Sequence, residues 1–313
     1  MKVIFYTPPK EAADWLRDFA HAMPEAELRE WQPGDDAPAD FAVVWRPPRE
    51  MFTPRAGLRA VFNLGAGVDA ILALEREHPG TLPRDAQLIR IEDGGMAPQM
   101  AEYVGHAVLR YLRRFDEYDI LQAERRWKVL EPHPRETFTV GILGMGVLGS
   151  HVARALAPFG MPVRGYSRSP RDIEGVKTYA GEAQFDAFLS GVKVLVNLLP
   201  HTPDTHDVLD ARVFSKLAHG AYLINVARGA HLVEQDLLDA LASGQIAAAT
   251  LDVFREEPLS ANHPFWRQPR ITITPHSSAL TLRAESVAQV AAKIAALARG
   301  ESVTGVVDLA RGY

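Results

Sequence analysis

A glycine-rich segment at 141–149 has the residue types that bind the phosphates of a dinucleotide. It reads Gly-Ile-Leu-Gly-Met-Gly-Val-Leu-Gly and lies between a β-branched and aromatic run and an alanine-rich helical pattern. Glycines in these places permit a tight turn, a close approach to a pyrophosphate and close helix–strand packing. The helix N-terminus then presents amides to the anion. The plainer interpretation is a turn that binds nothing. We predict cofactor contacts at Gly144, Met145, Gly146, Val147, Leu148 and Gly149.

The residues after the next predicted strand bear on which dinucleotide binds. Enzymes that use NAD usually carry Asp or Glu about 20 residues after the glycines, where it accepts from the ribose 2′-hydroxyl. Here Tyr-Ser-Arg-Ser-Pro-Arg occupies 166–171, without a carboxylate. Guanidinium and hydroxyl groups bind a 2′-phosphate. The alternative is a solvated basic loop. We expect NADPH to be preferred over NADH, with contacts from Ser167, Arg168, Ser169 and Arg171.

Three further motifs each begin at the end of a predicted strand. They are Asn-Val-Ala-Arg-Gly at 225–229, Leu-Asp-Val-Phe-Arg-Glu-Glu-Pro at 251–258 and Thr-Pro-His-Ser-Ser at 274–278. Open parallel sheets bind their ligands at the carboxyl ends of their strands. Taken singly, the charged residues of these motifs could be ordinary surface groups. Their joint occurrence at strand ends favours a site.

With these motifs the sequence resembles the D-isomer-specific 2-hydroxyacid dehydrogenases, most closely the glyoxylate/hydroxypyruvate reductase A type. The likeness covers nearly the whole chain. It includes Leu-Gly-Ala-Gly-Val-Asp at 64–69, Val-Trp-Arg-Pro-Pro at 44–48 and the terminal Arg-Gly-Tyr at 311–313. The resemblance implies reduction of small 2-oxo acids, with glyoxylate and hydroxypyruvate preferred, to 2-hydroxy acids by hydride transfer from NADPH.

The resemblance also implies the roles of individual residues. His276 would donate a proton to the carbonyl oxygen, a task suited to an imidazole, and Glu257 would orient its ring. Arg228 would anchor the substrate carboxylate and polarise the carbonyl. Asp252 would position the nicotinamide carboxamide. Further cofactor contacts are expected at Leu199, Pro200, Val226 and Ala227.

A second group of expected substrate contacts lies in the first hundred residues. The backbone amides of Ala66 and Gly67 match the family loop that cradles the substrate carboxylate. Trp45 and Arg46 are expected near the substrate, where a bulky ring leaves room only for a small acid; plain packing is the alternative. No metal site is expected, because the histidines in the 200–207 loop match no ligand spacing.

Short apolar runs alternate with helical patterns along the chain, which favours an α/β fold with parallel sheets covered on both faces. We expect two Rossmann-like doubly wound parallel-sheet domains with an active-site cleft between them. The substrate domain would comprise 1–98 plus 283–313, and the dinucleotide-binding domain 99–282. Strands are predicted at 3–6, 41–45, 60–64, 88–91, 137–143, 163–166, 192–199, 221–226, 248–253 and 271–273. Helices are predicted at 12–22, 98–122, 147–159, 234–243 and 280–298.

The charged segment 124–136 contains two prolines and little periodicity, which predicts a loop or arm. The resemblance places this arm, including Trp127, in the contact of a homodimer. We expect Trp127 to be buried in that interface; the alternative is that it reaches the pocket of the partner subunit.

Composition narrows the class of protein. The 313 residues are 47% hydrophobic and 23% charged, as in globular domains, and the net charge of −5 argues against a nucleic-acid partner. The absence of cysteine excludes disulfides and thiolate chemistry. No apolar run suits a signal peptide or a membrane span. We therefore expect a cytoplasmic protein without a membrane partner.

Two alternative functions belong to proteins of the same fold. One is a dinucleotide-sensing scaffold, like the corepressors that resemble this family, which could keep the same Arg228, Glu257 and His276. Formate oxidation is the other alternative, but that type of enzyme carries Gln where this chain has Glu257.

Overall fold

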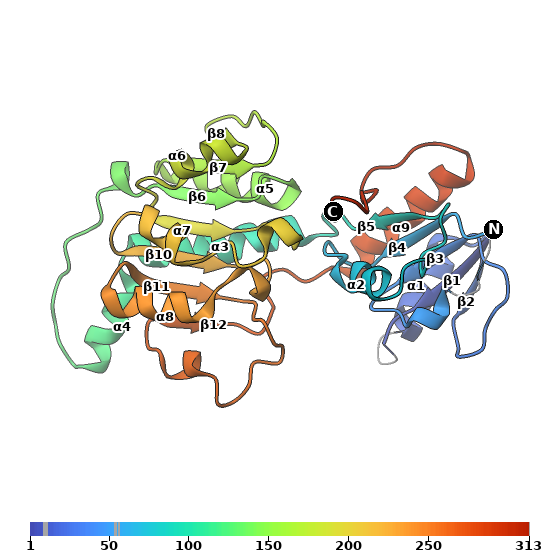
Figure 1. Ribbon diagram of the computed structural model, residues 1–313, viewed down its shortest axis with the longest axis horizontal. Helices are drawn as coiled ribbons and strands as arrows, with labels where there is room; N and C mark the ends of the chain where they lie inside the picture. The colour runs from blue at the N-terminus through green and yellow to red at the C-terminus, as the bar shows by residue number, and fades with distance from the viewer. Residues whose placement is uncertain (9–11, 53–54, 56, 313) are drawn as a thin grey trace. The chain divides into compact units, whose positions relative to one another are not determined.

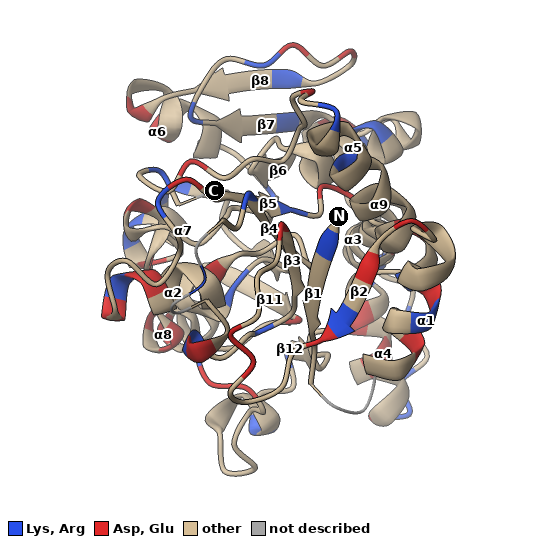
Figure 2. Ribbon diagram, turned by 90° about the vertical axis from the view of Figure 1, so that its right-hand side faces the viewer, with Lys and Arg blue, Asp and Glu red and all other residues tan. Residues whose placement is uncertain are grey.

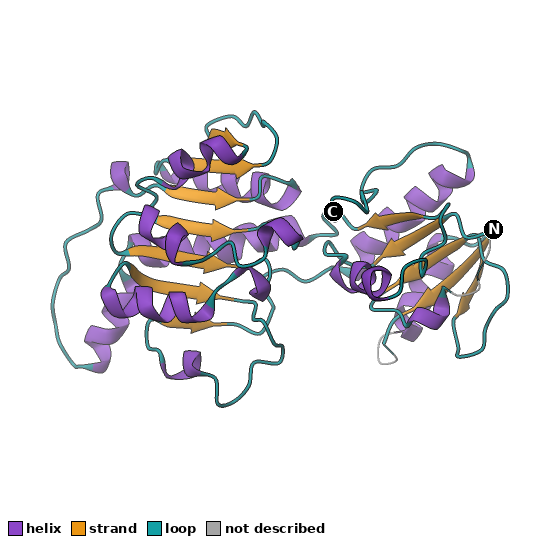
Figure 3. Ribbon diagram, viewed as in Figure 1, coloured by secondary structure: helices purple, strands orange, loops and turns teal. Residues whose placement is uncertain are grey.

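The chain folds into two compact units, which Figure 1 shows as a ribbon. This computed structural model describes residues 1–8, 12–52, 55 and 57–312. Unit 1 comprises residues 1–95 and 281–313, and unit 2 comprises residues 96–280. Each unit is a sheet flanked by helices (Figure 3), and the strand pairs described in both are parallel. The predicted fold class of two doubly wound parallel-sheet units is therefore confirmed.

Unit 1 contains a sheet with the strand order β2-β1-β3-β4-β5 among the described residues. Its central strands are continuous apolar runs, as expected for strands buried on both faces. One face packs against α2, and the other carries α1 and α9, which lie side by side. The strands are β1 (Lys2–Tyr6), β2 (Glu27–Glu30), β3 (Phe41–Val44), β4 (Ala60–Asn63) and β5 (Gln87–Arg90). The helices are α1 (Ala12–Ala22), α2 (Asp69–Glu77) and α9 (Arg283–Ala298).

The last helix belongs to unit 1 because both its apolar face and its charges are matched there. Arg283 at the start of α9 donates to Asp18 of α1 at 2.7 Å and to Asp14 at 3.2 Å. Figure 2 shows acidic and basic residues together on α1. Lys293, further along α9, binds Glu92 just after β5 at 3.1 Å. The C-terminal helix is thus bound to residues 201 to 269 positions earlier in the chain.

Unit 2 contains a sheet with the strand order β12-β11-β10-β9-β6-β7-β8 among the described residues. One face is covered by α3 and α5, and the other by α6, α7 and α8. The strands are β6 (Val140–Leu143), β7 (Val163–Ser167), β8 (Lys177–Ala180), β9 (Val194–Asn197), β10 (Ala221–Asn225), β11 (Ile246–Leu251) and β12 (Ile271–Ile273). The helices are α3 (Met96–Leu112), α4 (Phe115–Ala123), α5 (Val147–Leu156), α6 (Phe185–Leu189), α7 (Ala211–Lys216) and α8 (Glu234–Ser243). The chain order reverses between β6 and β9, which is where doubly wound sheets bind ligands.

The predicted single helix at 98–122 is wrong, because the structure has two helices there. Arg114, between α3 and α4, adopts a left-handed backbone conformation with φ of 59°. Its guanidinium forms a paired contact with Glu117 at 2.6 and 2.7 Å and donates to the carbonyl oxygen of Glu131, also at 2.6 Å. These side-chain bonds stabilise the turn between α3 and α4, and the spacing of hydrophobic residues does not predict them.

Several short elements were not predicted from the sequence: β2, α2, β8, α6 and α7. Strands β2 and β8 are the edges of their sheets. Their sequences, Glu-Leu-Arg-Glu and Lys-Thr-Tyr-Ala, lack the apolar runs that mark central strands. Edge strands are half exposed, so the hydrophobic pattern that finds buried strands misses them.

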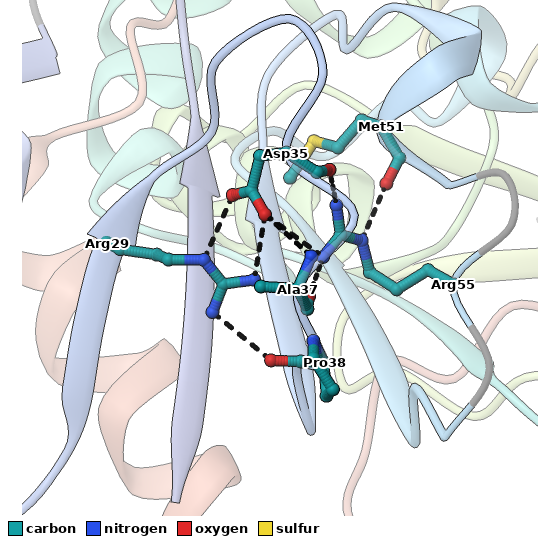
Figure 4. A network of polar contacts seen from close by, with 6 residues as sticks. All are labelled: Arg29, Asp35, Ala37, Pro38, Met51 and Arg55. Atoms are coloured by element: carbon teal, nitrogen blue, oxygen red, sulfur yellow. Dashed lines mark hydrogen bonds and ion pairs between the residues drawn. The ribbon is translucent and has the colours of Figure 1, made fainter.

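A polar network closes the loop between β2 and β3 in unit 1 (Figure 4). Arg55, whose side chain is 2% exposed, donates to the carbonyl oxygens of Asp35, Ala37 and Met51. Arg29 of β2 donates to the Asp35 carboxylate at 3.0 Å. The two guanidiniums thereby connect the carbonyl oxygens of this loop to one another.

Candidate active site

The turn between β6 and α5 is fixed by two glycines. Gly144 has a φ of 98°, and a Cβ atom there would lie 2.6 Å from the carbonyl oxygen of Leu198. At Gly149 a Cβ atom would lie 1.9 Å from the Gly144 carbonyl oxygen. Side chains at either position would open the turn. The tight turn and the close strand–helix packing predicted at these positions are both present.

Gly146 differs from these two glycines, because a Cβ atom there would meet no atom of the described residues within 4 Å. The residue is exposed and is the N-cap of α5. The first hydrogen bond of the helix runs from the Ser150 amide to the Gly146 carbonyl oxygen at 2.9 Å, so the amides of 146–148 precede the helical ladder. An exposed, side-chain-free helix start with open amides fits a pyrophosphate.

The other residues of the glycine segment pack on both sides of this turn. Met145 is buried, and its side chain occupies the space beside Gly165 of β7. Val147 is 49% exposed at the start of α5, whereas Leu148 packs against the core beneath it. The segment thus has a buried anchor and an exposed edge.

The segment after β7 exposes the residues expected to bind a 2′-phosphate. Arg168, Ser169 and Arg171 are exposed. The Ser167 hydroxyl donates to the carbonyl oxygen of Ser169 at 2.7 Å, and the Thr178 hydroxyl to that of Arg171 at 2.6 Å. The backbone is therefore folded back on β8 while both arginines reach the surface.

A pair of buried asparagines, Asn197 and Asn225, ends β9 and β10. The Asn197 amide donates to Asn225 at 3.0 Å, and Asn225 donates to the carbonyl oxygen of Arg228 at 3.1 Å. The oxygen of Asn197 also accepts from the amide of Leu199 at 3.2 Å. Asn225 is the first residue of the 225–229 motif noted in the sequence, whereas Asn197 and its bond to Asn225 were not anticipated. The pair fixes the two loops that carry the expected cofactor contacts Leu199, Pro200, Val226 and Ala227.

Arg228 lies half-buried in the loop after β10, and Gly229 sets how close that loop comes to the next one. A Cβ atom at Gly229 would lie 1.8 Å from the carbonyl carbon of Phe254. The glycine therefore lets the Arg228 loop lie directly on the loop after β11, which carries Asp252 and Glu257. The Arg228 guanidinium donates to the carbonyl oxygen of Ala227 at 2.6 Å.

Asp252 is fully buried and organises the loop that carries His276. Its Oδ1 accepts from the Thr274 hydroxyl at 2.5 Å and the Ser277 amide at 2.8 Å, and its Oδ2 from the Ser278 amide at 2.9 Å. Its backbone carbonyl oxygen accepts from the His276 amide at 2.8 Å. Asp252 thus grips the histidine loop through side chain and backbone together.

His276 and Glu257 form the central polar pair of unit 2. Nδ1 of His276 lies 2.8 Å from Oε2 of Glu257, and Oε1 of Glu257 accepts from the Phe254 amide at 3.0 Å. The His276 side chain is 45% exposed, and Nε2 has no hydrogen-bond partner among the described residues. A ring held by a carboxylate through one nitrogen is oriented to exchange a proton through the other.

The expected substrate residues of unit 1 form a compact cluster of their own. A Cβ atom on Gly65 would lie 2.5 Å from the Trp45 ring, and the Arg46 guanidinium lies 5.7 Å from the centroid of that ring. The Asn63 side-chain amide donates to the carbonyl oxygens of Gly65 and Gly67 at 2.9 and 2.8 Å. Trp45 is therefore packed on the 65–67 loop, which leaves Ala66 and Gly67 half-exposed.

Two other features singled out in the sequence lie elsewhere. The ring centroids of His201 and His206 are 5.8 Å apart, but the described residues contain no cluster of three metal-ligating His, Asp or Glu side chains. The last residue of the terminal motif, Tyr313, lies outside the described residues. In the described part of the chain, no helix has both the length and the apolar character needed to cross a membrane.

Comparison with known proteins assigns the chain to a family. Residues 106–278 match the model of the D-isomer specific 2-hydroxyacid dehydrogenase NAD binding domain. The chain is 57% identical to glyoxylate/hydroxypyruvate reductase A of Serratia proteamaculans over 313 residues, 100% of both chains. A D-isomer specific 2-hydroxyacid dehydrogenase from Xanthobacter autotrophicus Py2, solved with NADPH and MES, superposes with a TM-score of 0.92 at 36% identity. That alignment covers 100% of this chain and 99% of the other.

A solved reductase from Sinorhizobium meliloti gives a similar result. This NADPH-dependent glyoxylate/hydroxypyruvate reductase, in complex with NADP and sulfate, has a TM-score of 0.89 and 38% identity. The alignment covers 100% of this chain and 99% of that one.

A glycine turn at the switch point of a parallel sheet, with a carboxylate-held imidazole in the same unit, defines the class of protein: an NAD(P)-dependent oxidoreductase. The chain belongs to the D-isomer-specific 2-hydroxyacid dehydrogenase family and is of the glyoxylate/hydroxypyruvate reductase A type. The relatives described above give no support to the alternative of a corepressor-like scaffold.

Proposed function

We propose that this protein reduces glyoxylate and hydroxypyruvate to their 2-hydroxy acids with NADPH, using His276 as the proton donor. The observation that carries the proposal is the 2.8 Å contact between His276 Nδ1 and Glu257, with Nε2 left to act. The names of the similar proteins, which are glyoxylate/hydroxypyruvate reductases, support this choice of substrates.

The chain's own residues account for each requirement of the reaction. When bound, the nicotinamide cofactor supplies a hydride to C2 of the 2-oxo acid. His276 gives the proton of Nε2 to the carbonyl oxygen, so that the carbonyl becomes a hydroxyl. Glu257 keeps the ring in place and stabilises its charged form. Arg228 holds the substrate carboxylate with a fork of donors and polarises the carbonyl oxygen.

Unit 1 would contribute the remaining substrate contacts. The half-exposed amides at Ala66 and Gly67 suit a carboxylate, and the Asn63 side chain fixes their loop. Trp45 and Arg46 would limit the size of the acid. In unit 2, Asp252 is the residue that we propose for the nicotinamide carboxamide; among the described residues its Oδ2 accepts one hydrogen bond, from the Ser278 amide.

The preference for NADPH rests on the exposed arginines after β7. Arg168 and Arg171 project from a backbone segment held by hydrogen bonds to its own carbonyls. The structures of similar proteins hold NADPH or NADP. We assign the 2′-phosphate to Arg168 and Arg171, with the hydroxyls of Ser167 and Ser169 beside it.

A homodimer would use the arm at 124–136. Trp127 is fully exposed within one chain, at 101% of its reference area, and Val129 is 83% exposed. Large apolar side chains exposed next to each other mark a surface that another chain covers. A second copy of this protein is the partner we propose, and a cytoplasmic location remains a prediction.

One steady-state assay tests the proposed reaction. Loss of absorbance of the reduced nicotinamide is followed with NADPH and with NADH, each against glyoxylate, hydroxypyruvate and a longer 2-oxo acid. We expect the highest kcat/KM with NADPH and one of the two small acids. Turnover only with the longer acid, or a higher kcat/KM with NADH, would overturn the corresponding part of the proposal.

A further inference from the structure

A chain of hydrogen bonds in unit 2 runs from helix α3 to the histidine loop. The Tyr103 hydroxyl lies 2.6 Å from Oγ1 of Thr274, and Thr274 donates to Oδ1 of Asp252 at 2.5 Å. Tyr103 and Thr274 are 171 residues apart in sequence. Neither residue is needed to bind the substrate or the cofactor in the reaction proposed above.

The direction of this chain follows from the donors available. A carboxylate only accepts, and Asp252 already accepts from the amides of Ser277 and Ser278. Thr274 has one hydroxyl proton, which goes to Asp252. The Tyr103 hydroxyl must therefore donate to Thr274. Burial raises the pKa of Tyr103 to about 12, which keeps that proton in place at physiological pH.

Asp252, the last residue in this series of hydrogen bonds, bears directly on the position of His276. His276 has a φ of 54°, a left-handed conformation that is unfavourable for a residue other than glycine. The Asp252 carbonyl oxygen accepts from the His276 amide, and the Asp252 carboxylate holds the next two amides. The histidine keeps this conformation because Asp252 is itself held, and Thr274 is one of the groups that hold it.

We propose that Tyr103 and Thr274 are positioning residues for the proton transfer: through Asp252 they hold the His276 loop in its reactive conformation. The inference rests on the proposed function, in which His276 is the proton donor. It assigns to α3, a helix that otherwise packs in the core, a share in the chemical step.

The same helix supplies a matched control. Tyr111, two turns further along α3, makes the same type of bond to Oγ1 of Thr250 in β11, at 2.7 Å. Tyr111 is more deeply buried than Tyr103 and stacks on Tyr222 with 4.2 Å between ring centroids. The Thr250 hydroxyl has no bond to Asp252 among the described residues. Removing the Tyr111 hydroxyl therefore tests the loss of a tyrosine–threonine bond alone.

The experiment compares Tyr103→Phe, Thr274→Val, Thr274→Ser and Tyr111→Phe in the full-length protein. We expect kcat with glyoxylate and NADPH to fall roughly tenfold in Tyr103→Phe and in Thr274→Val, about the value of one hydrogen bond. The Kd for NADPH should stay within about twofold, whereas Thr274→Ser should recover most of the activity and Tyr111→Phe should keep kcat. The melting temperature should fall at least as much in Tyr111→Phe as in Tyr103→Phe, which separates folding from positioning.

Three results would overturn the inference: equal kcat for Tyr103→Phe and wild type, equal loss in Thr274→Ser and Thr274→Val, or equal loss in Tyr103→Phe and Tyr111→Phe. A double-mutant cycle with His276→Ala adds a fourth. If Tyr103 acts through His276, Tyr103→Phe should leave the residual rate of His276→Ala unchanged. Full activity of His276→Ala, by contrast, would refute the proposed function itself, so the two failures are distinguishable.

Discussion

Two clusters of charged side chains, one in each unit, are built in different ways: the network around Arg55 in unit 1 and the Glu257–His276 pair in unit 2. In unit 1, the Arg55 guanidinium is buried and gives its hydrogen bonds to loop carbonyls, and Asp35 accepts from Arg29 (Figure 4). In unit 2, Glu257 and His276 are 32% and 45% exposed, and the imidazole uses one nitrogen toward the protein. The first cluster uses its bonding capacity internally, and the second keeps part of it for a ligand.

The two clusters also sit on differently prepared backbones. In unit 2, Gly229 lets two loops pack closely, and the buried Asp252 accepts hydrogen bonds from the histidine loop. The half-exposed groups are therefore supported by other, buried residues. In unit 1 the guanidinium of Arg55 itself supports the loop, through its hydrogen bonds to the loop carbonyls. We therefore expect the unit 2 pair, which other residues support, to act in the reaction, and the unit 1 network, in which the charges are the support, to act in stability.

The comparison predicts its largest effect at His276. His276→Ala should lower kcat for glyoxylate by about 10²- to 10⁴-fold, the usual contribution of a general acid. The Kd for NADPH and the melting temperature should change little, because the ring makes one hydrogen bond to the described residues and is half exposed. Steady-state kinetics, a fluorescence titration and a thermal melt measure the three. A large drop in melting temperature would mean that this cluster, too, is structural.

The opposite pattern is expected at Arg55. Arg55→Met should lower the free energy of unfolding by about 1 to 3 kcal/mol, because the buried Met51 carbonyl oxygen loses its donor and Asp35 loses one of its two cations. The kcat should remain that of the wild type. Denaturant unfolding measures the loss, and Arg17→Met on α1 is the control, since the Arg17–Asp14 pair is exposed to solvent and should contribute little to stability. Equal losses in both variants would contradict the assignment.

Sequence reasoning reached the strands of unit 2 other than β8 and, through the family resemblance, the pairing of Glu257 with His276. It missed β2, which carries Arg29 of the unit 1 network, and the hydrogen bonds that support both clusters. Apolar runs predict the central strands, and the spacing of Gly144 and Gly149 before a helical pattern predicts the turn. Tyr103 and Thr274 meet only after 171 intervening residues have folded, and no local pattern marks that contact. Asn197 likewise needs a neighbouring strand before its role is visible. Asp252 was expected to position the nicotinamide carboxamide, and its hold on the histidine loop emerged only from the packed structure.

A third arginine, Arg168, extends the comparison to an exposed guanidinium. Arg168→Ala should raise the Kd for NADPH about 10- to 100-fold, the value of a hydrogen bond between charged groups, and leave that for NADH within about threefold. Titration of both cofactors measures the ratio. Arg212→Ala on α7 makes the same change in net charge at a side chain that is 70% exposed, and serves as the control. Equal weakening for both cofactors would place the 2′-phosphate elsewhere.

The smallest expected effect concerns Asp116. Among the described residues this carboxylate accepts no hydrogen bond from an arginine, whereas Asp35 accepts one from Arg29. The hydrogen bond from Arg29 is the main cause that lowers the pKa of Asp35, whereas burial raises the pKa of Asp116, in α4, to about 6. Among the described residues, Oδ1 of Asp116 has no hydrogen-bond partner. A carboxyl group whose folded pKa lies above its ordinary value of 3.8 favours folding while protonated, and this stability is lost as the pH rises through 6.

Asp116→Asn should therefore raise the melting temperature at pH 8 and change it little at about pH 2.5, where the pH is well below both pKa values and the carboxyl group is protonated in both states. Thermal melts across this range measure the difference. Asp119→Asn on the same helix is the control, because that side chain is 59% exposed and bound to Arg110. A stabilisation of Asp116→Asn that is the same at both pH values would show that ionisation is not the cause. In that case α4 would tolerate the Asp116 carboxylate although its Oδ1 accepts no hydrogen bond from the described residues, unlike Asp35 in the network around Arg55.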